Sequence, residues 1–162
     1  MEAYLDNSAT TRVDAQVQEL MKKLMDVDFG NPSSRHQKGV VAEGYIKDAR
    51  QKIAATLKVD PKELIITSGG TESNNMALIG TALAAKRKGN HIITTAVEHP
   101  SVKATASFLE EQGFRITFLS VDSRGQISLE ELKEALTPDT ILVSIMYVNN
   151  EIGTIQPIEE AA

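Results

Sequence analysis

The sequence predicts an α/β protein with a mostly parallel sheet, and three observations support this fold class. Helix-like and strand-like segments alternate along the 162 residues. The largely apolar run TILVSIMYV (140–148) is typical of a strand in the buried centre of a parallel sheet. Polar clusters at 68–75, 98–99 and 149–151 each follow a strand-like run, so parallel strands would bring them to one edge.

The helices are predicted from apolar residues at helical spacing and from signals at the helix ends. Pro100 suits the first turn of a helix, and Gly89 and Gly113 suit the residues just after one. Ser128 and Glu131 have the spacing of a capping box. Helices are therefore expected at 13–26, 36–57, 71–88, 100–112 and 129–136.

Strands are expected in the apolar runs between these helices, at 63–68, 91–97, 114–121 and 140–148. The stretch 120–131 imitates a calcium-binding loop, but Arg124 occupies a ligand position, so a turn before a capped helix is predicted. Pro157 would open a helix that stops at Ala162. Because a single helical turn is marginal alone, the sequence is expected to be cut inside this element.

Composition narrows the function classes. The net charge is −5 without a Lys/Arg block, which argues against a nucleic-acid surface. There are no cysteines, so these residues offer no disulfide or thiolate, and the three histidines lack metal-ligand spacing. The first residues do not form a secretory signal, and no apolar run approaches the ~18 residues of a membrane span. A soluble protein of the cytoplasm, or of an organellar matrix, is expected.

The stretch Ser68-Gly69-Gly70-Thr71 joins an expected strand to an expected helix. Free N–H groups at a helix N-terminus favour an anion such as a phosphate, and glycine allows close approach. The alternative is a left-handed glycine turn with Thr71 as the N-cap. The local pattern leaves both open.

The other two clusters also leave alternatives open. His99 follows Glu98 and could be an acid or base, a ring-stacking group or a ligand, or simply a hydrogen-bonded loop residue. Asn149, Asn150 and Glu151 could form a binding site or an ordinary turn. Their expected convergence at one sheet edge favours a binding site.

Five segments together carry a resemblance to a known family: YLDNSATT (4–11), FGNPSSRH (29–36), TSGGTESNN (67–75), EH (98–99) and VNNEIGTIQPI (148–158). In this order they resemble the cysteine desulfurases of the NifS/IscS type, which are class V aminotransferases. The resemblance implies the three-layer large domain of fold-type I pyridoxal 5'-phosphate (PLP) enzymes, incomplete here. Residues 1–12 would belong with the small domain and 13–162 with the PLP-binding large domain.

The resemblance also implies roles for particular residues. Gly70 and Thr71 would hold the phosphate of PLP, His99 would stack on the pyridine ring and act as a catalytic proton carrier, and Asn150 would bond to the ring's phenolic oxygen. The family takes sulfur from L-cysteine, works as a homodimer, and passes sulfur to an iron–sulfur scaffold or another acceptor protein.

The family's Schiff-base lysine and its catalytic cysteine lie in later segments. None of the eleven lysines present has the matching context, so this chain alone is expected to be inactive. Two alternatives remain at this point. One is another fold-type I PLP enzyme, such as a selenocysteine lyase or an aminotransferase-like lyase. The other is a non-catalytic phosphate-binding or interaction domain.

Overall fold

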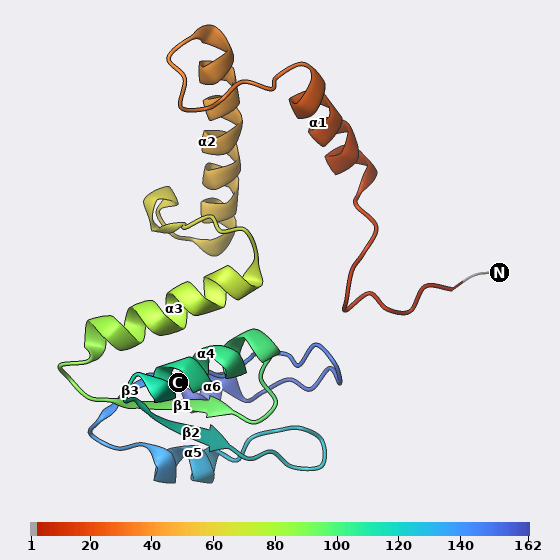
Figure 1. Ribbon diagram of the computed structural model, residues 1–162. Coiled ribbons are helices and arrows are strands. Elements are labelled where there is room, and N and C mark those ends of the chain that lie inside the picture. Colours follow the sequence, from red (N-terminus) through yellow and green to blue (C-terminus); the bar gives the residue numbers. More distant parts are fainter. Residues whose placement is uncertain (1–2) are drawn as a thin grey trace. The chain divides into compact units, whose positions relative to one another are not determined.

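The computed structural model describes residues 3–162, which form two compact units (Figure 1). The first unit ends at Ile66 and the second is Thr67–Ala162. Among the described residues, none of the helices combines the length and the hydropathy that a membrane span needs.

The first unit consists of helices α1 (Ala15–Asp26) and α2 (Gln37–Leu57) and the 3-10 helix η1 (Pro61–Glu63). Both α-helices were predicted, and each begins after a residue whose side chain accepts a hydrogen bond from the first turn. Asp14 caps α1 and His36 caps α2.

The strand predicted at 63–68 is wrong. Residues 61–63 form η1, and 64–67 belong to no helix or strand. The exposed fractions of Ile65 and Ile66 are 69% and 60%, and the Leu64 carbonyl accepts from the Arg50 guanidinium at 2.5 Å. An apolar run forms a strand only where a neighbouring strand pairs with it, and no strand within residues 3–162 pairs with this one.

The second unit is built on a parallel sheet in the order β2-β1-β3, which confirms the predicted fold class. Its strands are β1 (His91–Thr95), β2 (Arg115–Leu119) and β3 (Thr140–Val143). The central strand β1 is buried along its whole length. It is β1, and not the more apolar 140–148 run, that occupies the centre of this sheet.

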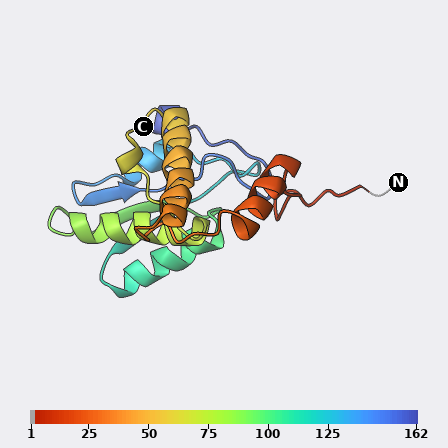
Figure 2. The ribbon, with the colours of Figure 1, turned by 90° about the horizontal axis from the view of Figure 1, so that it is seen from above.

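Helices cover both faces of the sheet and give three layers (Figures 1 and 2). Helices α3 (Gly70–Ala85) and α4 (Pro100–Glu111) lie side by side on one face, while α5 (Leu129–Ala135) and α6 (Ile158–Ala161) lie on the other. Ile92 packs with α3 and α4, and the next residue, Ile93, packs with the opposite layer. This alternation is what a strand imposes on consecutive side chains.

Candidate functional site

The carboxyl ends of β1 and β3 lead into the segments that carry two of the predicted polar clusters. Residues 96–99 connect β1 to α4, and 144–150 follow β3. Because the strands are parallel, both segments leave the sheet at the same edge. The third cluster, at the start of α3, does not follow a strand as predicted, but hydrogen bonds join it to α4.

Helix α3 begins with backbone donors that have no partner among the residues that the structure describes. Gly69 is the N-cap and no side chain caps the helix, so the predicted alternative with Thr71 as N-cap is wrong. The first bond inside the helix runs from the Ser73 N–H to the Gly69 carbonyl. Within residues 3–162, the N–H groups of Gly70 and Thr71 and the hydroxyl of Thr71 are therefore left to bind something else.

Ser68, by contrast, already has partners. Its N–H and its hydroxyl both donate to the Glu72 carboxylate at 2.6 Å. Both bonds lower the pKa of Glu72, the one from the Ser68 hydroxyl more than the one from its N–H. The Glu72 side chain is therefore kept ionised. An anion at this helix end would therefore meet Gly70 and Thr71 rather than Ser68.

Neither the backbone conformation nor the packing around this helix end explains why both Gly69 and Gly70 are glycines. Gly69 has φ 166°, which is extended backbone open to any residue, so the predicted left-handed turn is not formed. A Cβ built on Gly69 or Gly70 would meet nothing within 4 Å. Open space in front of unpartnered N–H groups fits a phosphate that approaches the backbone closely.

His99 is the N-cap of α4 and is exposed. Its Nδ1 accepts from the Ser101 N–H at 3.1 Å and lies 2.8 Å from the Ser101 Oγ. Its Nε2 has no partner among the described residues. The alternative that His99 is simply a hydrogen-bonded residue thus accounts for Nδ1 but leaves Nε2 free for a ligand.

Helix α3 is tied to α4 through the two asparagines of the SGGTESNN motif. The Asn74 amide donates to Ser101 Oγ at 2.9 Å, and the Thr105 hydroxyl donates to Asn75 Oδ1 at 2.9 Å. These bonds hold the open start of α3 and His99 in one arrangement.

Glu98 joins the segments that follow β1 and β3. Glu98 is 5% exposed, and its carboxylate accepts from the Met146 N–H at 2.6 Å and from the Thr95 hydroxyl at 3.3 Å. Burial raises the pKa of this carboxyl. The sequence marks Glu98 only as the neighbour of His99, because an acidic residue at a strand end gives no sign that it will be buried.

Asn149 makes a second link between the same segments. Its amide donates to the Val97 carbonyl at 3.0 Å, and its Oδ1 accepts from the Glu151 and Ile152 N–H groups. Asn149 is buried, whereas Asn150 is exposed at the turn and forms none of the side-chain hydrogen bonds of residues 3–162. The buried asparagine shapes the turn, and the exposed one is free to contact a ligand.

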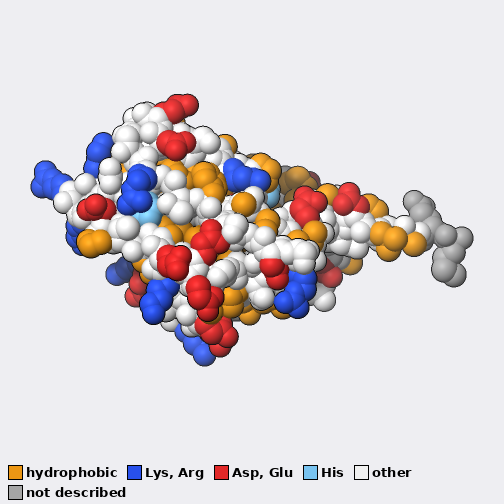
Figure 3. Space-filling view, turned by 90° about the horizontal axis from the view of Figure 1, so that it is seen from below, with side chains coloured by type: hydrophobic (Ala, Val, Ile, Leu, Met, Phe, Trp, Pro, Cys, Tyr) orange, Lys and Arg blue, Asp and Glu red, His pale blue; other side chains and the backbone are white. Residues whose placement is uncertain are grey.

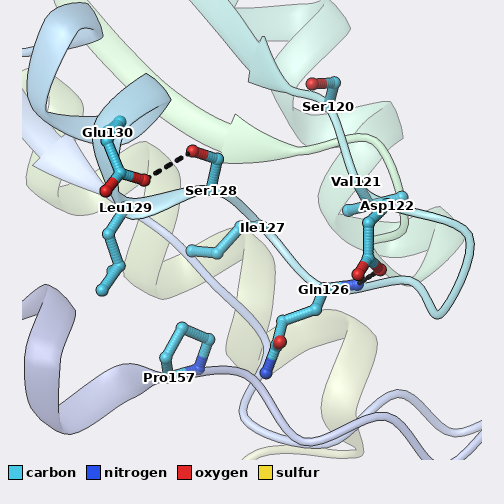
Figure 4. A pocket seen from close by; sticks show the side chains of 9 residues that line it. All are labelled: Ser120, Val121, Asp122, Gln126, Ile127, Ser128, Leu129, Glu130 and Pro157. Carbon is cyan, nitrogen blue, oxygen red and sulfur yellow. Dashed lines mark hydrogen bonds between the residues drawn. The ribbon is translucent and has the colours of Figure 1, made fainter.

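A hollow of about 570 Å³ lies away from these residues, beside α5 (Figure 4). It is lined by Ser120, Val121, Asp122, Gln126, Ile127, Ser128, Leu129, Glu130 and Pro157. None of the predicted site residues lines it, and within residues 3–162 no three His, Cys, Asp or Glu side chains are grouped to hold a metal. The hollow is therefore not part of the predicted site.

The capping box predicted beside this hollow is only half formed. Ser128 Oγ accepts from the Glu131 N–H, as predicted, but the Glu131 carboxylate accepts from the N–H and hydroxyl of Ser120. The second half of the box is lost to this tertiary partner. The turn predicted in place of a calcium loop is present, with Gly125 donating to the Asp122 carbonyl.

Comparison with known proteins identifies the class to which this fold and site belong. Residues 3–162 match the aminotransferase class-V family, and the chain belongs to this family. This confirms the family predicted from the five sequence segments.

Individual proteins of known class are similar to this chain over nearly its whole length. The chain is 52% identical over 159 residues to the cysteine desulfurase IscS of Dictyoglomus turgidum, covering 98% of this chain and 40% of the relative. A solved NifS-like protein matches with a TM-score of 0.95 and 45% identity, covering 99% of this chain and 44% of that one. SspA in complex with cysteine matches with a TM-score of 0.88 and 42% identity, over 95% and 44% of the two chains. The chain thus spans less than half the length of each.

Proposed function

We propose that this chain forms the cofactor-binding part of a PLP-dependent cysteine desulfurase. Such an enzyme removes sulfur from L-cysteine and leaves L-alanine and an enzyme persulfide, which serves iron–sulfur cluster assembly and thiolation. The observation that carries the proposal is the open start of α3, joined through Asn74 and Ser101 to an exposed His99. Close relatives that are named cysteine desulfurases support it.

The described residues offer groups that fit PLP. The N–H groups of Gly70 and Thr71, the Thr71 hydroxyl and the positive end of the α3 dipole would hold its phosphate. The ring of His99 would lie against the pyridine ring, and the amide of Asn150 would bond to the phenolic oxygen. When bound, PLP supplies an electron sink for the amino acid.

The chain's own residues would act on this assembly by orienting it and by handling a proton. A phosphate fixed at one helix end and a ring fixed at His99 leave the cofactor little freedom to turn, which is the benefit of a preorganised site. His99 would meet this assembly through Nε2, because its Nδ1 already accepts from the Ser101 N–H. His99 is thus the catalytic residue that we assign to this chain.

The reaction also requires a cofactor-binding lysine and a thiolate that attacks the substrate sulfur. We propose that both come from residues outside these 162, and that the 162-residue chain is inactive alone. The solved SspA carries cysteine, which supports L-cysteine as the substrate. We further propose a homodimer that passes sulfur to an iron–sulfur scaffold or another acceptor protein. A cytoplasmic location would keep the thiol reduced.

The test is to supply the complete enzyme with PLP and L-cysteine and to measure L-alanine and persulfide. We expect L-alanine and persulfide to form in equal amounts, and the 162-residue chain to form neither. A complete enzyme that binds PLP but releases alanine only from L-selenocysteine would contradict the proposal that L-cysteine is the substrate. One that binds no PLP would contradict the proposal as a whole.

A further inference from the structure

A hydrogen-bond chain runs from α3 through α4 to the ring of His99. The Asn74 amide nitrogen lies 2.9 Å from Ser101 Oγ, and Ser101 Oγ lies 2.8 Å from His99 Nδ1. The backbone N–H of Ser101 also points at the same ring nitrogen, at 3.1 Å. All three residues belong to the second unit.

The chemistry of these groups decides which group donates in each of these hydrogen bonds. An amide NH₂ can only donate, so Ser101 Oγ accepts from Asn74 and has its own proton left for His99 Nδ1. The Ser101 backbone N–H can only donate as well. Two donors therefore face Nδ1, and a neutral imidazole that accepts at Nδ1 must carry its proton on Nε2.

The surroundings protect this arrangement from competing partners. Ser101 is 7% exposed and Asn74 is half-buried, so water has little access to the hydroxyl. The Thr105 hydroxyl, with its single proton, lies 2.8 Å from the Ser101 carbonyl oxygen and 2.9 Å from Asn75 Oδ1, so it can donate to either, and it braces α4 against α3 one turn further along. A hydrogen bond shielded in this way is stronger than the same bond in water.

We propose that Asn74 and Ser101 are positioning residues that hold His99 as the Nε2–H tautomer. The exposed edge of the ring then presents one N–H donor in a fixed direction. That this donor serves an oxygen or sulfur anion of the cofactor–substrate complex rests on the proposed function, whereas the tautomer itself does not. The same α3 that would hold the phosphate thereby also sets the proton position on His99.

Nitrogen-15 NMR of histidine-labelled protein tests the tautomer, because a ring nitrogen without a proton resonates far downfield of an N–H nitrogen. Spectra are taken in alkaline solution, where imidazoles are neutral, and a His99→Gln variant assigns the signals. We expect Nε2 to be protonated. Ser101→Ala should lower the ratio of Nε2–H to Nδ1–H by roughly fivefold, the effect of one hydrogen bond, and Ser101→Thr should restore it.

Asn74→Asp is the sharper variant, because a carboxylate would accept the Ser101 hydroxyl proton and turn the oxygen's lone pair towards Nδ1. We expect it to move the population towards Nδ1–H. The matched controls are Gln112→Glu, which adds the same charge at the exposed C-cap of α4, and Ser107→Ala, which removes an exposed hydroxyl from α4. Both should leave the ratio unchanged.

A wild-type protein with its proton on Nδ1 would overturn the proposal. So would a ratio that is the same in Asn74→Asp and Ser101→Ala as in the wild type. PLP binding is measured separately by absorbance. A protein with the expected tautomer that binds no PLP would contradict the proposed function and leave the hydrogen-bond chain intact.

Discussion

Thr71 lies at the open start of α3, and its hydroxyl bonds to none of the described residues. If this hydroxyl donates to the cofactor phosphate, Thr71→Val should weaken PLP binding by roughly ten- to a hundredfold, as for one hydrogen bond to a charged group. Absorbance titration of the complete enzyme with PLP measures the effect. Thr81→Val, an exposed change further along α3, should have none; equal affinities for all three proteins would remove Thr71 from the site.

Glu98 should make stability depend on pH in a particular direction. Because burial raises the pKa of this carboxyl, its favourable contribution is complete below the ordinary Glu pKa of about 4.3 and is lost as pH rises through the raised value. Glu98→Gln removes the titration. From pH 4 to 8, the free energy of unfolding of the wild type should therefore fall relative to that of Glu98→Gln in urea titrations.

Glu110→Gln, which changes an exposed carboxylate on α4, provides the control for Glu98. Its difference from the wild type should not follow the same pH course. A constant difference between the wild type and Glu98→Gln over this range, or one of opposite sign, would show that Glu98 is not held in the buried arrangement seen here.

The residues of the candidate site were predictable to different degrees. Gly70, Thr71, His99 and Asn150 could be named from the sequence because their motifs are specific, and their roles towards PLP remain predictions. The links made by buried Glu98 were not predictable, since they depend on how two loops meet after the sheet has formed.

A substitution at the start of helix α3 should affect the stability of the protein and its affinity for PLP in opposite directions. Gly70→Ala places a methyl group in open space at a helical position, so the free energy of unfolding should rise by about 0.5–1 kcal/mol. The same methyl group would stand where the phosphate approaches. PLP affinity should therefore fall by at least about tenfold, measured by absorbance titration beside urea unfolding.

Gly80→Ala is the matched control, because Gly80 also lies in α3 with nothing within 4 Å of an added Cβ. This change should stabilise the helix similarly and leave PLP affinity unchanged. If Gly70→Ala binds PLP as tightly as Gly80→Ala does, the phosphate does not lie at this helix end.

The sheet contains its own titrating group. His91 is fully buried in β1, and its ring nitrogens lie 2.8 Å from the hydroxyls of Thr117 in β2 and Thr140 in β3. Burial, and then the charge of Arg115, lowers the pKa of His91. The stability it contributes is complete above the ordinary His pKa of about 6.5 and is lost as pH falls through the lowered value.

Between pH 8 and 5, the wild type should therefore lose free energy of unfolding more steeply than His91→Gln in urea titrations. His36→Asn replaces an exposed histidine while keeping a side chain suited to capping α2, and should retain the wild-type slope. An unchanged slope in His91→Gln would contradict the link between the three strands.

Helices were predicted better than strands, for a physical reason. Pro100 and the apolar spacing after it mark α4 locally, and the helix begins at Pro100 as expected. The 140–148 run is a strand only as far as Val143, and beyond it the Met146 N–H donates to the Glu98 carboxylate instead of to a strand. Pairing partners decide strands, and one sequence segment does not reveal its partners.

For the whole molecule, the alternation of helices and strands was enough to predict the α/β class. It was not enough to predict which apolar side chains are exposed on the surface. On the face shown in Figure 3, acidic and basic side chains are mixed with apolar ones. The predicted apolar stripe of α1 is present, yet Val17, Leu20 and Met21 are 47%, 45% and 49% exposed. The proposed assignment of 1–12 and 13–162 to the family's small and large domains remains a prediction.

The position of PLP tests the central claim most directly. A crystal structure of the complete enzyme with PLP should place the phosphate within hydrogen-bond distance of the N–H groups of Gly70 and Thr71, and the pyridine ring against His99. A phosphate bound away from α3, for example in the hollow between Ser120 and Pro157, would contradict the account.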